Sequence, residues 1–301
     1  MSSKHNPIIK GLYADPDILQ AGDTFYLYPT SDGFTHWSGT QFHVFSSGDR
    51  IHWKDEGVIL DLATEDVAWA AGSAWAPAIA HKNGSYYFYF CGKRPDHASC
   101  IGVAVAQTPA GPFKAMAEPL LTPELAAAEN IKLSQTIDPS IFTEEDGTSY
   151  LYFGNGGAAV VALNDDMVSL KPGTMRQLEG LYDFREAVTV MKQNGTYHFT
   201  WSCDDTGSEE YHVNYGTSDH PYGPVEYHYR ILEKDVSKDI LGTGHHTILR
   251  PEGTDEYYIF YHRFGTPLEE YPEGKGYHRE ICMDRLLFDE KGRMIPVKVT
   301  D

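Results

Sequence analysis

The sequence lacks any hydrophobic run long enough to cross a membrane. None of its 301 residues falls in a window that approaches the roughly 18 consecutive apolar residues of a transmembrane helix. The opening segment, Met1–Pro7, is polar and has no apolar core of the kind found in secretory signal peptides. We therefore expect no membrane partner and predict a cytoplasmic location.

Basic residues are also scarce. Lysine and arginine together number 24 against 43 aspartate and glutamate residues, which gives a formal net charge of −19. A surface with this charge repels phosphate backbones and anionic lipid, so nucleic acid is excluded as a partner, whereas a neutral substrate meets no penalty. The sequence carries no association motif and leaves the oligomeric state open.

Paired cysteines and strong helix signals are missing as well. The four cysteines (Cys91, Cys100, Cys203 and Cys282) show no CxxC spacing, and we expect reduced, buried thiols. A single short helix is indicated after Thr122, which can cap it, with Pro123 at the first helical position. A chain of this length with so little helix signal is expected to be nearly all β.

What the sequence does contain is a repeated strand unit. An Asp-Pro step at Asp15-Pro16 opens a short strand, which a turn at Gly22-Asp23 joins to a tyrosine-rich strand. Varied copies of this unit begin at Trp75, Ile137, Glu186 and His245. Five copies spaced roughly 50 to 60 residues apart indicate a repeat architecture, and repeats made of strands favour a propeller. We predict an all-β, five-bladed β-propeller that forms a single catalytic domain over residues 1–301.

The later strands of each blade are predicted from alternation and turn signals. They are placed at 41–46 and 53–60 in blade one, 102–106 in blade two, 160–163 and 167–170 in blade three, 211–216 and 225–229 in blade four, and 281–288 and 294–299 in blade five. Blade two is expected to end near Phe113, before the short helix.

The first strand of each propeller blade lines the central axis, so polar residues on these strands are candidates for chemistry. They are Asp15, Trp75, Asp138, Glu186 and His245. Three carboxylates from three blades that converge on one axis repel one another and are desolvated, which raises at least one pKa. That is the condition for dividing acid and base roles among carboxylates.

Each of these residues also has a purely structural interpretation. Asp-Pro steps commonly just start turns, although the recurrence of Asp15-Pro16 at Asp138-Pro139 favours function for both. Glu186 can simply pair with Arg185, and His245 can be a core histidine with satisfied hydrogen bonds.

The ordered set of motifs resembles glycoside hydrolase family 43, whose members are five-bladed propellers. The matching stretches are Tyr13-Ala-Asp15-Pro-Asp17, Trp75-Ala-Pro77, Ile137-Asp138-Pro-Ser140, Glu186 at the start of the fourth repeat, and Gly242-Thr-Gly-His245. The resemblance implies that Asp15 is the general base, that Asp138 modulates the pKa of the acid and orients it, and that Glu186 is the general acid. It further implies hydrolysis with inversion, which requires acid and base carboxyls roughly 6.5–9.5 Å apart.

The same resemblance implies no redox or organic cofactor, and it suggests a calcium ion or a water cluster next to the channel histidine, here His245. The expected partner is an oligosaccharide or polysaccharide. Stacking platforms and hydrogen-bonding groups for it are sought among aromatic and charged residues near the axis. We predict Trp37, Trp75, Phe34, Asp32 and Arg279 as substrate-binding residues, with Arg263 as the alternative arginine and Trp69 and Trp201 as further aromatic candidates.

The expected activity is exo-acting release of α-L-arabinofuranosyl units from oligosaccharides of arabinan or arabinoxylan. The sequence ends soon after the fifth repeat, without the C-terminal β-sandwich of many family β-xylosidases, and this favours the arabinofuranosidase. A β-xylosidase or another furanosidase or galactosidase of the family is the alternative activity. A carbohydrate-binding propeller without catalysis is the alternative class of protein.

Overall fold

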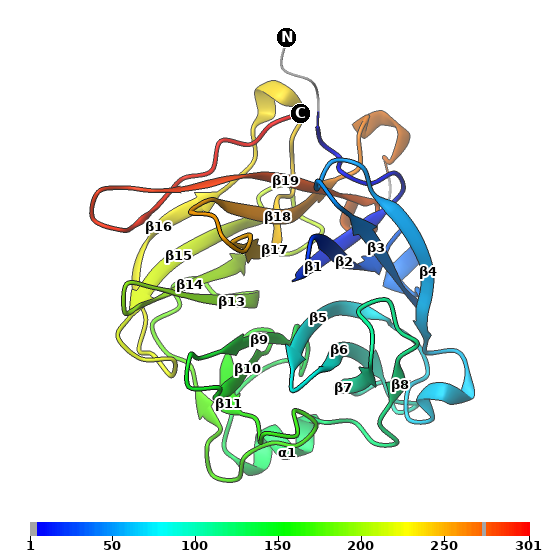
Figure 1. Ribbon diagram of the computed structural model, residues 1–301. Coiled ribbons are helices and arrows are strands. Elements are labelled where there is room, and N and C mark those ends of the chain that lie inside the picture. Colours follow the sequence, from blue (N-terminus) through cyan, green and yellow to red (C-terminus); the bar gives the residue numbers. More distant parts are fainter. Residues whose placement is uncertain (1–4, 273–274) are drawn as a thin grey trace.

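The computed structural model describes residues 5–272 and 275–301, which form five four-stranded antiparallel sheets arranged around one axis (Figure 1). The first sheet contains β1 (Tyr13–Ala21), β2 (Thr24–Ser31), β3 (Gln41–Ser47) and β4 (Lys54–Asp61), and the second β5 (Trp75–Lys82), β6 (Ser85–Lys93), β7 (Ser99–Ala106) and β8 (Lys114–Ala115). The third contains β9 (Ser140–Thr143), β10 (Ser149–Phe153), β11 (Ala159–Ala162) and β12 (Arg176–Gln177). The fourth contains β13 (Glu186–Gln193), β14 (Thr196–Cys203), β15 (His212–Ser218) and β16 (Glu226–Leu232), and the fifth β17 (Gly244–Leu249), β18 (Tyr257–Phe264), β19 (Arg279–Phe288) and β20 (Met294–Ile295). The predicted five-bladed all-β propeller is confirmed.

The first strands of the blades form a closed ring. β1 contacts β5, β5 contacts β9, β9 contacts β13, β13 contacts β17, and β17 returns to β1. Closure therefore brings the first and last blades of the chain side by side (Figure 1), and the backbone N–H of His5 donates to the carbonyl of Asp301 (3.1 Å). The backbone N–H of Ile8 donates to the carbonyl of Ile281, so the N-terminal segment runs along the fifth blade.

Alternating side chains of the second strands build the core on both faces of each sheet. On β6, Phe88 and Phe90 pack toward the first blade, whereas Tyr87 and Tyr89 pack toward the third. This is the two-residue period of a strand whose faces are both covered. The buried apolar residues fall into five main clusters, one between each pair of neighbouring blades, and the second strands β2, β6, β10 and β18 each contribute to two of them.

Most strand predictions are confirmed, and the outer strands account for the errors. The segment 167–170 is not an outer strand of blade three, because Met167 lies in a turn at positive φ and Leu170 forms only an isolated bridge to Leu163. The outer strand is instead Arg176–Gln177. In the fifth blade β20 is shorter than predicted, and in the second β8 begins just after Phe113. Outer strands make one ladder only, so hydrophobic alternation marks them weakly.

Helical structure is sparse, as predicted. α1 (Pro123–Ala128) lies between the second and third blades, and the Thr122 hydroxyl accepts a hydrogen bond from the backbone N–H of Leu125. Short 3₁₀ turns are η1 (Thr35–Trp37), η2 (Glu65–Val67), η3 (Val236–Lys238), η4 (Leu268–Glu270) and η5 (Lys275–Tyr277). Within the described ranges, no helix has both the length and the apolar character needed to cross a membrane. The four cysteines are free and buried.

Asp17 joins three blades at the axis. Its carboxylate accepts hydrogen bonds from the backbone N–H of Ile79 in the second blade (2.8 Å) and from the hydroxyl of Thr247 in the fifth (2.8 Å). Burial raises the pKa of Asp17 to about 6, although these hydrogen bonds oppose the rise. The carboxyl thus supports ring closure, and its ionisation weakens the folded state as pH rises through this pKa.

Replacing Asp17 by alanine is expected to destabilise the protein. The N–H of Ile79 would lose its acceptor, at a cost of about 1–3 kcal/mol. The difference from wild type should be larger near about pH 5, where Asp17 is protonated in the folded state, than near about pH 8, where its ionisation already weakens the wild type. Urea unfolding at both pH values measures both effects.

The control is Asp23→Ala in the exposed turn between β1 and β2. It should leave stability almost unchanged at either pH. An equal loss in both variants, or a difference that grows with pH, would contradict the assigned role of Asp17.

Candidate active site

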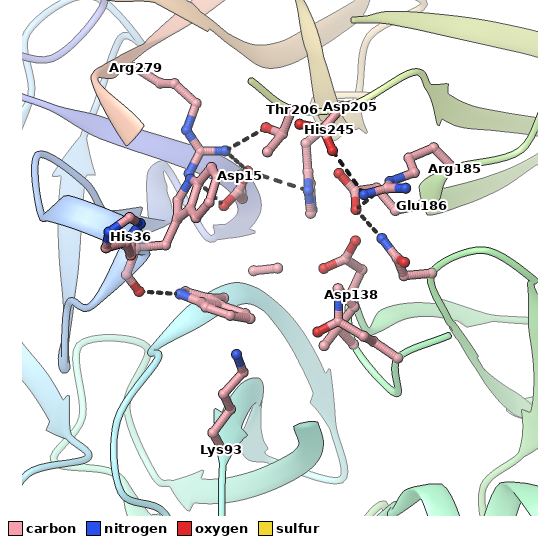
Figure 2. Close-up of a pocket in the computed structure, with 16 residues that line it drawn as sticks. Asp15, His36, Lys93, Asp138, Arg185, Glu186, Asp205, Thr206, His245 and Arg279 are labelled. Atoms are coloured by element: carbon pink, nitrogen blue, oxygen red, sulfur yellow. Dashed lines mark hydrogen bonds and ion pairs between the residues drawn. The ribbon is translucent and has the colours of Figure 1, made fainter. Parts of the chain in front are cut away.

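A pocket of about 380 Å³ opens at the ends of the five first strands. Its lining includes all five first-strand residues singled out by sequence, namely Asp15, Trp75, Asp138, Glu186 and His245. Figure 2 shows Asp15 beside Arg279 on one side of the pocket and Glu186 beside Arg185 on the other, with Asp138 below Glu186 in this view. The pocket therefore collects three carboxyls from the first, third and fourth blades.

A repeated backbone irregularity aims these side chains. Each first strand has a non-glycine residue at positive φ at its pocket end: Asp15 (48°), Ala76 (40°), Asp138 (58°), Ala187 (59°) and His245 (38°). In four blades the strand register shifts at this point, as in a β-bulge, and in the third blade β9 begins two residues later. Bulges re-aim side chains and are over-represented next to active sites. Each such residue costs of order 1–3 kcal/mol, which the surrounding ladder must offset.

Asp15 is held by cationic and imidazole nitrogens. The Arg279 guanidinium donates to it through Nη1 (2.9 Å) and Nη2 (3.4 Å). Nδ1 of His262 lies 3.0 Å and Nδ1 of His245 lies 3.3 Å from Oδ1 of the same carboxylate. Nε2 of His262 has no partner among the described residues, so a proton on Nδ1 leaves no N–H of this ring unsatisfied.

These contacts keep Asp15 ionised. Burial alone would raise the pKa of Asp15, but the Arg279 guanidinium, His245 and the hydrogen bond from His262 outweigh it and hold the pKa well below its usual range. Burial also lowers the pKa of His262 to about 3, so this ring is neutral. Asp15 is therefore an anion that can accept a proton.

Arg279 is itself fixed by Asp32. Its Nε donates to Oδ2 of Asp32 (2.8 Å), and the backbone N–H of Arg279 donates to the same oxygen (3.0 Å). Nη1 also donates to the hydroxyl of Thr206 (3.2 Å). The guanidinium thus bridges two buried carboxylates, and all three side chains are nearly inaccessible to solvent.

Glu186 is held by two neutral donors. The hydroxyl of Tyr211 donates to Oε1 (2.8 Å), and Nδ2 of Asn155 donates to Oε2 (2.6 Å). Tyr211 reaches this position because it packs on Gly244, where an added Cβ would lie 2.3 Å from the ring. Its ring also stacks on His262, with centroids 5.6 Å apart and planes 1° apart. The stack links the surroundings of Glu186 to those of Asp15.

Asp138 is buried, and its carboxyl has less hydrogen-bond support than those of Asp15 and Glu186. Its backbone N–H donates to Sγ of Cys91 (3.1 Å), and among the described residues its Oδ2 has no hydrogen-bond partner. Burial first, and then the charges of Glu186 and Asp15, raise the pKa of Asp138 well above its usual range. Asp138 is therefore expected to hold its proton near neutral pH.

Two tryptophans form one wall. Nε1 of Trp37 donates to the carbonyl of Gly276 (2.6 Å), and Nε1 of Trp75 donates to the carbonyl of Trp37 (2.6 Å). The ammonium of Lys93 lies over the Trp75 ring, 4.7 Å from its centroid. Both rings thus have their polar edges satisfied by backbone, which leaves apolar surface for a ligand.

The structure brings most predicted binding residues together but not all of them. Trp37, Trp75 and Arg279 line the pocket. Phe34 and Asp32 do not line this pocket, and their assignment as substrate-binding residues stays a prediction. Phe34 is 48% exposed in a neighbouring hollow, and Asp32 is buried behind Arg279.

The remaining candidates lie outside the pocket lining. Arg263 pairs with Glu280 (2.8 Å). Trp69 stacks on Phe90 in the core, and Trp201 is fully buried.

The calcium predicted near His245 stays a prediction, and the residues around it fit the ion poorly. The channel below the pocket has a cavity of about 20 Å³, room for about one water molecule. Both carboxylate oxygens of Asp17 already accept hydrogen bonds, and calcium takes about 6–8 oxygen ligands.

Sequence reasoning missed several pocket residues. Asn155 lies in the stretch Gly154-Asn-Gly-Gly157. This glycine cluster is visible in the sequence, but it does not fit the pattern of a phosphate-binding loop. Tyr211, just before β15, and His262, on β18, lie behind the pocket lining, and tyrosines and histidines are common in this chain. A polar side chain within a buried strand is the signal that could have identified them.

Comparisons with known proteins agree with this geometry. The family model described as glycosyl hydrolases family 43 matches residues 4–294. The β-D-galactofuranosidase xynD of Aspergillus niger is 34% identical, over 98% of this chain and 85% of the relative. A xylosidase/arabinosidase of Bacteroides ovatus is 30% identical over the whole of both chains.

Among solved structures, a thermostable family-43 glycoside hydrolase superposes with a TM-score of 0.83 at 27% identity, covering 99% of this chain and 96% of that one. The residues matched by the family model span the propeller and include the positions of all three pocket carboxyls. The chain therefore belongs to glycosyl hydrolases family 43, and it is a glycoside hydrolase.

Proposed function

We propose that this chain is an exo-acting, inverting glycosidase that releases α-L-arabinofuranosyl residues from oligosaccharides of arabinan or arabinoxylan. The observation that carries the proposal is the convergence of Asp15, Asp138 and Glu186 on one pocket, each in a different electrostatic environment. Two carboxyls that differ in protonation are what glycoside hydrolysis requires.

Asp15 acts as the general base. It is ionised because Arg279 and the two histidines stabilise its charge. It takes a proton from a water molecule that attacks the anomeric carbon, on the face opposite to the leaving oxygen. His262 and Arg279 keep the carboxylate oriented throughout the step.

Glu186 acts as the general acid, and in this role it enters the reaction carrying a proton. It gives this proton to the glycosidic oxygen as the bond to the anomeric carbon breaks. The Tyr211 hydroxyl can donate a hydrogen bond to the Glu186 carboxylate or accept one from the carboxylic acid. It can therefore stay hydrogen-bonded to Glu186 before and after the proton is transferred. Asp138 is itself expected to be protonated in the free enzyme, because burial raises its pKa.

Exo action is supported by the wall beside the pocket. An added Cβ at Gly276 would lie 2.8 Å from Cα of Gly207 and 2.9 Å from the Trp37 ring. Loops from the first, fourth and fifth blades therefore touch one another here. A pocket closed on this side, with a volume near the lower end of ligand sites, suits a terminal sugar better than an internal one.

The choice of sugar is supported by the relatives. One relative is named for a galactofuranose and the other for xylose and arabinose. Arabinofuranose shares its five-membered ring with the first sugar, and it is a pentose like those of the second. A β-xyloside is the alternative substrate, since the name of the second relative includes it.

The function is tested with an aryl α-L-arabinofuranoside, an aryl β-D-xyloside and an arabino-oligosaccharide. Wild type is expected to prefer the arabinofuranoside and to release monosaccharide from the oligomer. Glu186→Gln should lower kcat about 10²–10⁴-fold on the oligomer, and less on an aryl glycoside whose leaving group needs no proton.

The matched control is Glu179→Gln, an exposed glutamate on the segment that leads to the same strand, which should behave as wild type. Preference for the xyloside would keep the mechanism and replace the sugar. Undiminished hydrolysis of the oligomer by Glu186→Gln would refute the acid assignment.

The pH dependence tests the base. Arg279→Met removes the cation that stabilises ionised Asp15, and Asp32→Asn is made with it so that Asp32 is not left as a second unpaired buried carboxylate. The pKa of Asp15 should rise, and the acidic limb of the kcat/KM profile should move to higher pH.

The control is the other buried arginine pair of the fifth blade, altered as Arg263→Met with Glu280→Gln. It should lower stability without moving the acidic limb. All three proteins (wild type and the two double variants) are measured below their unfolding temperatures. If the acidic limb lies at the same pH in all of them, Arg279 does not set the protonation of the base.

A further inference from the structure

Three side chains with metal-binding atoms gather on the fourth blade, outside the pocket lining. They are the carboxylate of Asp183, the thiol of Cys203 and the imidazole of His212, and their ligand atoms lie within 4.8 Å of one another. Cys203 ends β14 and His212 begins β15, and the two residues are direct partners in the ladder. Directly opposite residues point to the same face of a sheet, which explains why their side chains meet.

The hydrogen bonds around His212 prepare it as a ligand. Its Nδ1 lies 2.8 Å from the carbonyl oxygen of Glu210, which can only accept, so Nδ1 carries the proton. The lone pair is then on Nε2. A backbone carbonyl that fixes the second nitrogen in this way is the usual support of a metal-bound histidine.

A second feature is the amide of Asn214, two residues further along β15 and hence on the same face as His212. Asn214 is 1% exposed, and its Oδ1 has no hydrogen-bond partner among the described residues. Its Nδ2 donates to the carbonyl of Tyr182, the residue before Asp183 (3.1 Å). Sγ of Cys203 lies 3.8 Å from that same carbonyl. An unpartnered buried oxygen thus borders the three-residue cluster.

We propose that Asp183, Cys203 and His212 form a binding site for a zinc ion, with the fourth position taken by water or by Oδ1 of Asn214. Zinc accepts sulfur, nitrogen and oxygen ligands in a tetrahedron. Calcium and magnesium favour all-oxygen sites, so a thiol and an imidazole exclude them. Cys203 and His212 are buried and Asp183 is exposed, which leaves the ion a route from solvent.

Zinc binding at this site releases a proton. Binding forms the zinc–sulfur bond, breaks the S–H bond and passes the proton to solvent. Three charged groups face the thiol and imidazole: Asp183 and Asp204, which oppose proton loss, and Arg230 on β16, which favours it.

The ion would brace the strand that carries Glu186. Asp183 lies three residues before Glu186, and Cys203 follows Ser202, the ladder partner of Glu186. Zinc therefore ties the approach segment of β13 to β14 and β15. Its effect is on the stability of the fourth blade, because none of its ligands lines the pocket.

The experiment uses tag-free, full-length protein freed of metal with a chelator and kept reduced. Co²⁺ serves as the optical probe and Zn²⁺ as the competitor. One equivalent of Co²⁺ should give d–d bands of a tetrahedral site and a thiolate-to-cobalt charge-transfer band, and Zn²⁺ should abolish both.

The variants assign the site. Cys203→Ser should lose the charge-transfer band, whereas Cys282→Ser, another fully buried free cysteine, should keep it. Asp183→Asn, at an exposed position where folding is not at risk, should weaken Zn²⁺ binding at least about tenfold. Added Zn²⁺ should raise the unfolding temperature of wild type and not of Cys203→Ser.

The proposal is overturned if no charge-transfer band appears, if Cys203→Ser retains it, or if Asp183→Asn binds Zn²⁺ as tightly as wild type. Because every readout is metal binding or stability, these outcomes are independent of the sugar that the enzyme cleaves.

Discussion

The buried ion pair between Asp15 and Arg279 joins the first and last blades of the propeller and sets the protonation state of Asp15 in the pocket. Asp15 comes from the first blade and Arg279 from the fifth, 264 positions later. Breaking a buried pair of this kind costs about 3–5 kcal/mol, because one charge is left without a partner. Asp32 completes the arrangement by holding the other edge of the guanidinium. The contact that closes the ring therefore also keeps Asp15 in the ionised state.

The irregular backbone at the pocket end of each first strand explains how a regular repeat fold can direct different side chains into one pocket. A straight strand would continue its pleat and keep its side chains between neighbouring blades. The left-handed residue interrupts the pleat at the same point in every blade, so Asp15, Asp138 and His245 reach the axis. Asp17 lies just past the bulge in β1 and has a structural role, because its hydrogen bonds connect the first blade to the second and fifth blades.

The three carboxyls show how environment separates identical chemical groups. Asp15 lies against a guanidinium and two imidazoles, and its pKa is lowered. Asp138 is buried beside other carboxyls without a cation in contact, and its pKa is raised. Glu186 is held by neutral donors from Tyr211 and Asn155. Proton affinity therefore follows from the partners of each group, and a hydrolase needs such a difference between its acid and its base.

The sequence by itself determined the five repeats, the all-β propeller and the three carboxylates, because strand periodicity, Asp-Pro steps and hairpin turns are local signals that recur. The tertiary structure alone decided which residues support them. Tyr211, Asn155 and His262 act through contacts with residues far away in sequence, and Asp32 serves Arg279 rather than the ligand. Hydrogen-bond partners and burial depend on how the blades close into a ring, and no local pattern encodes that closure.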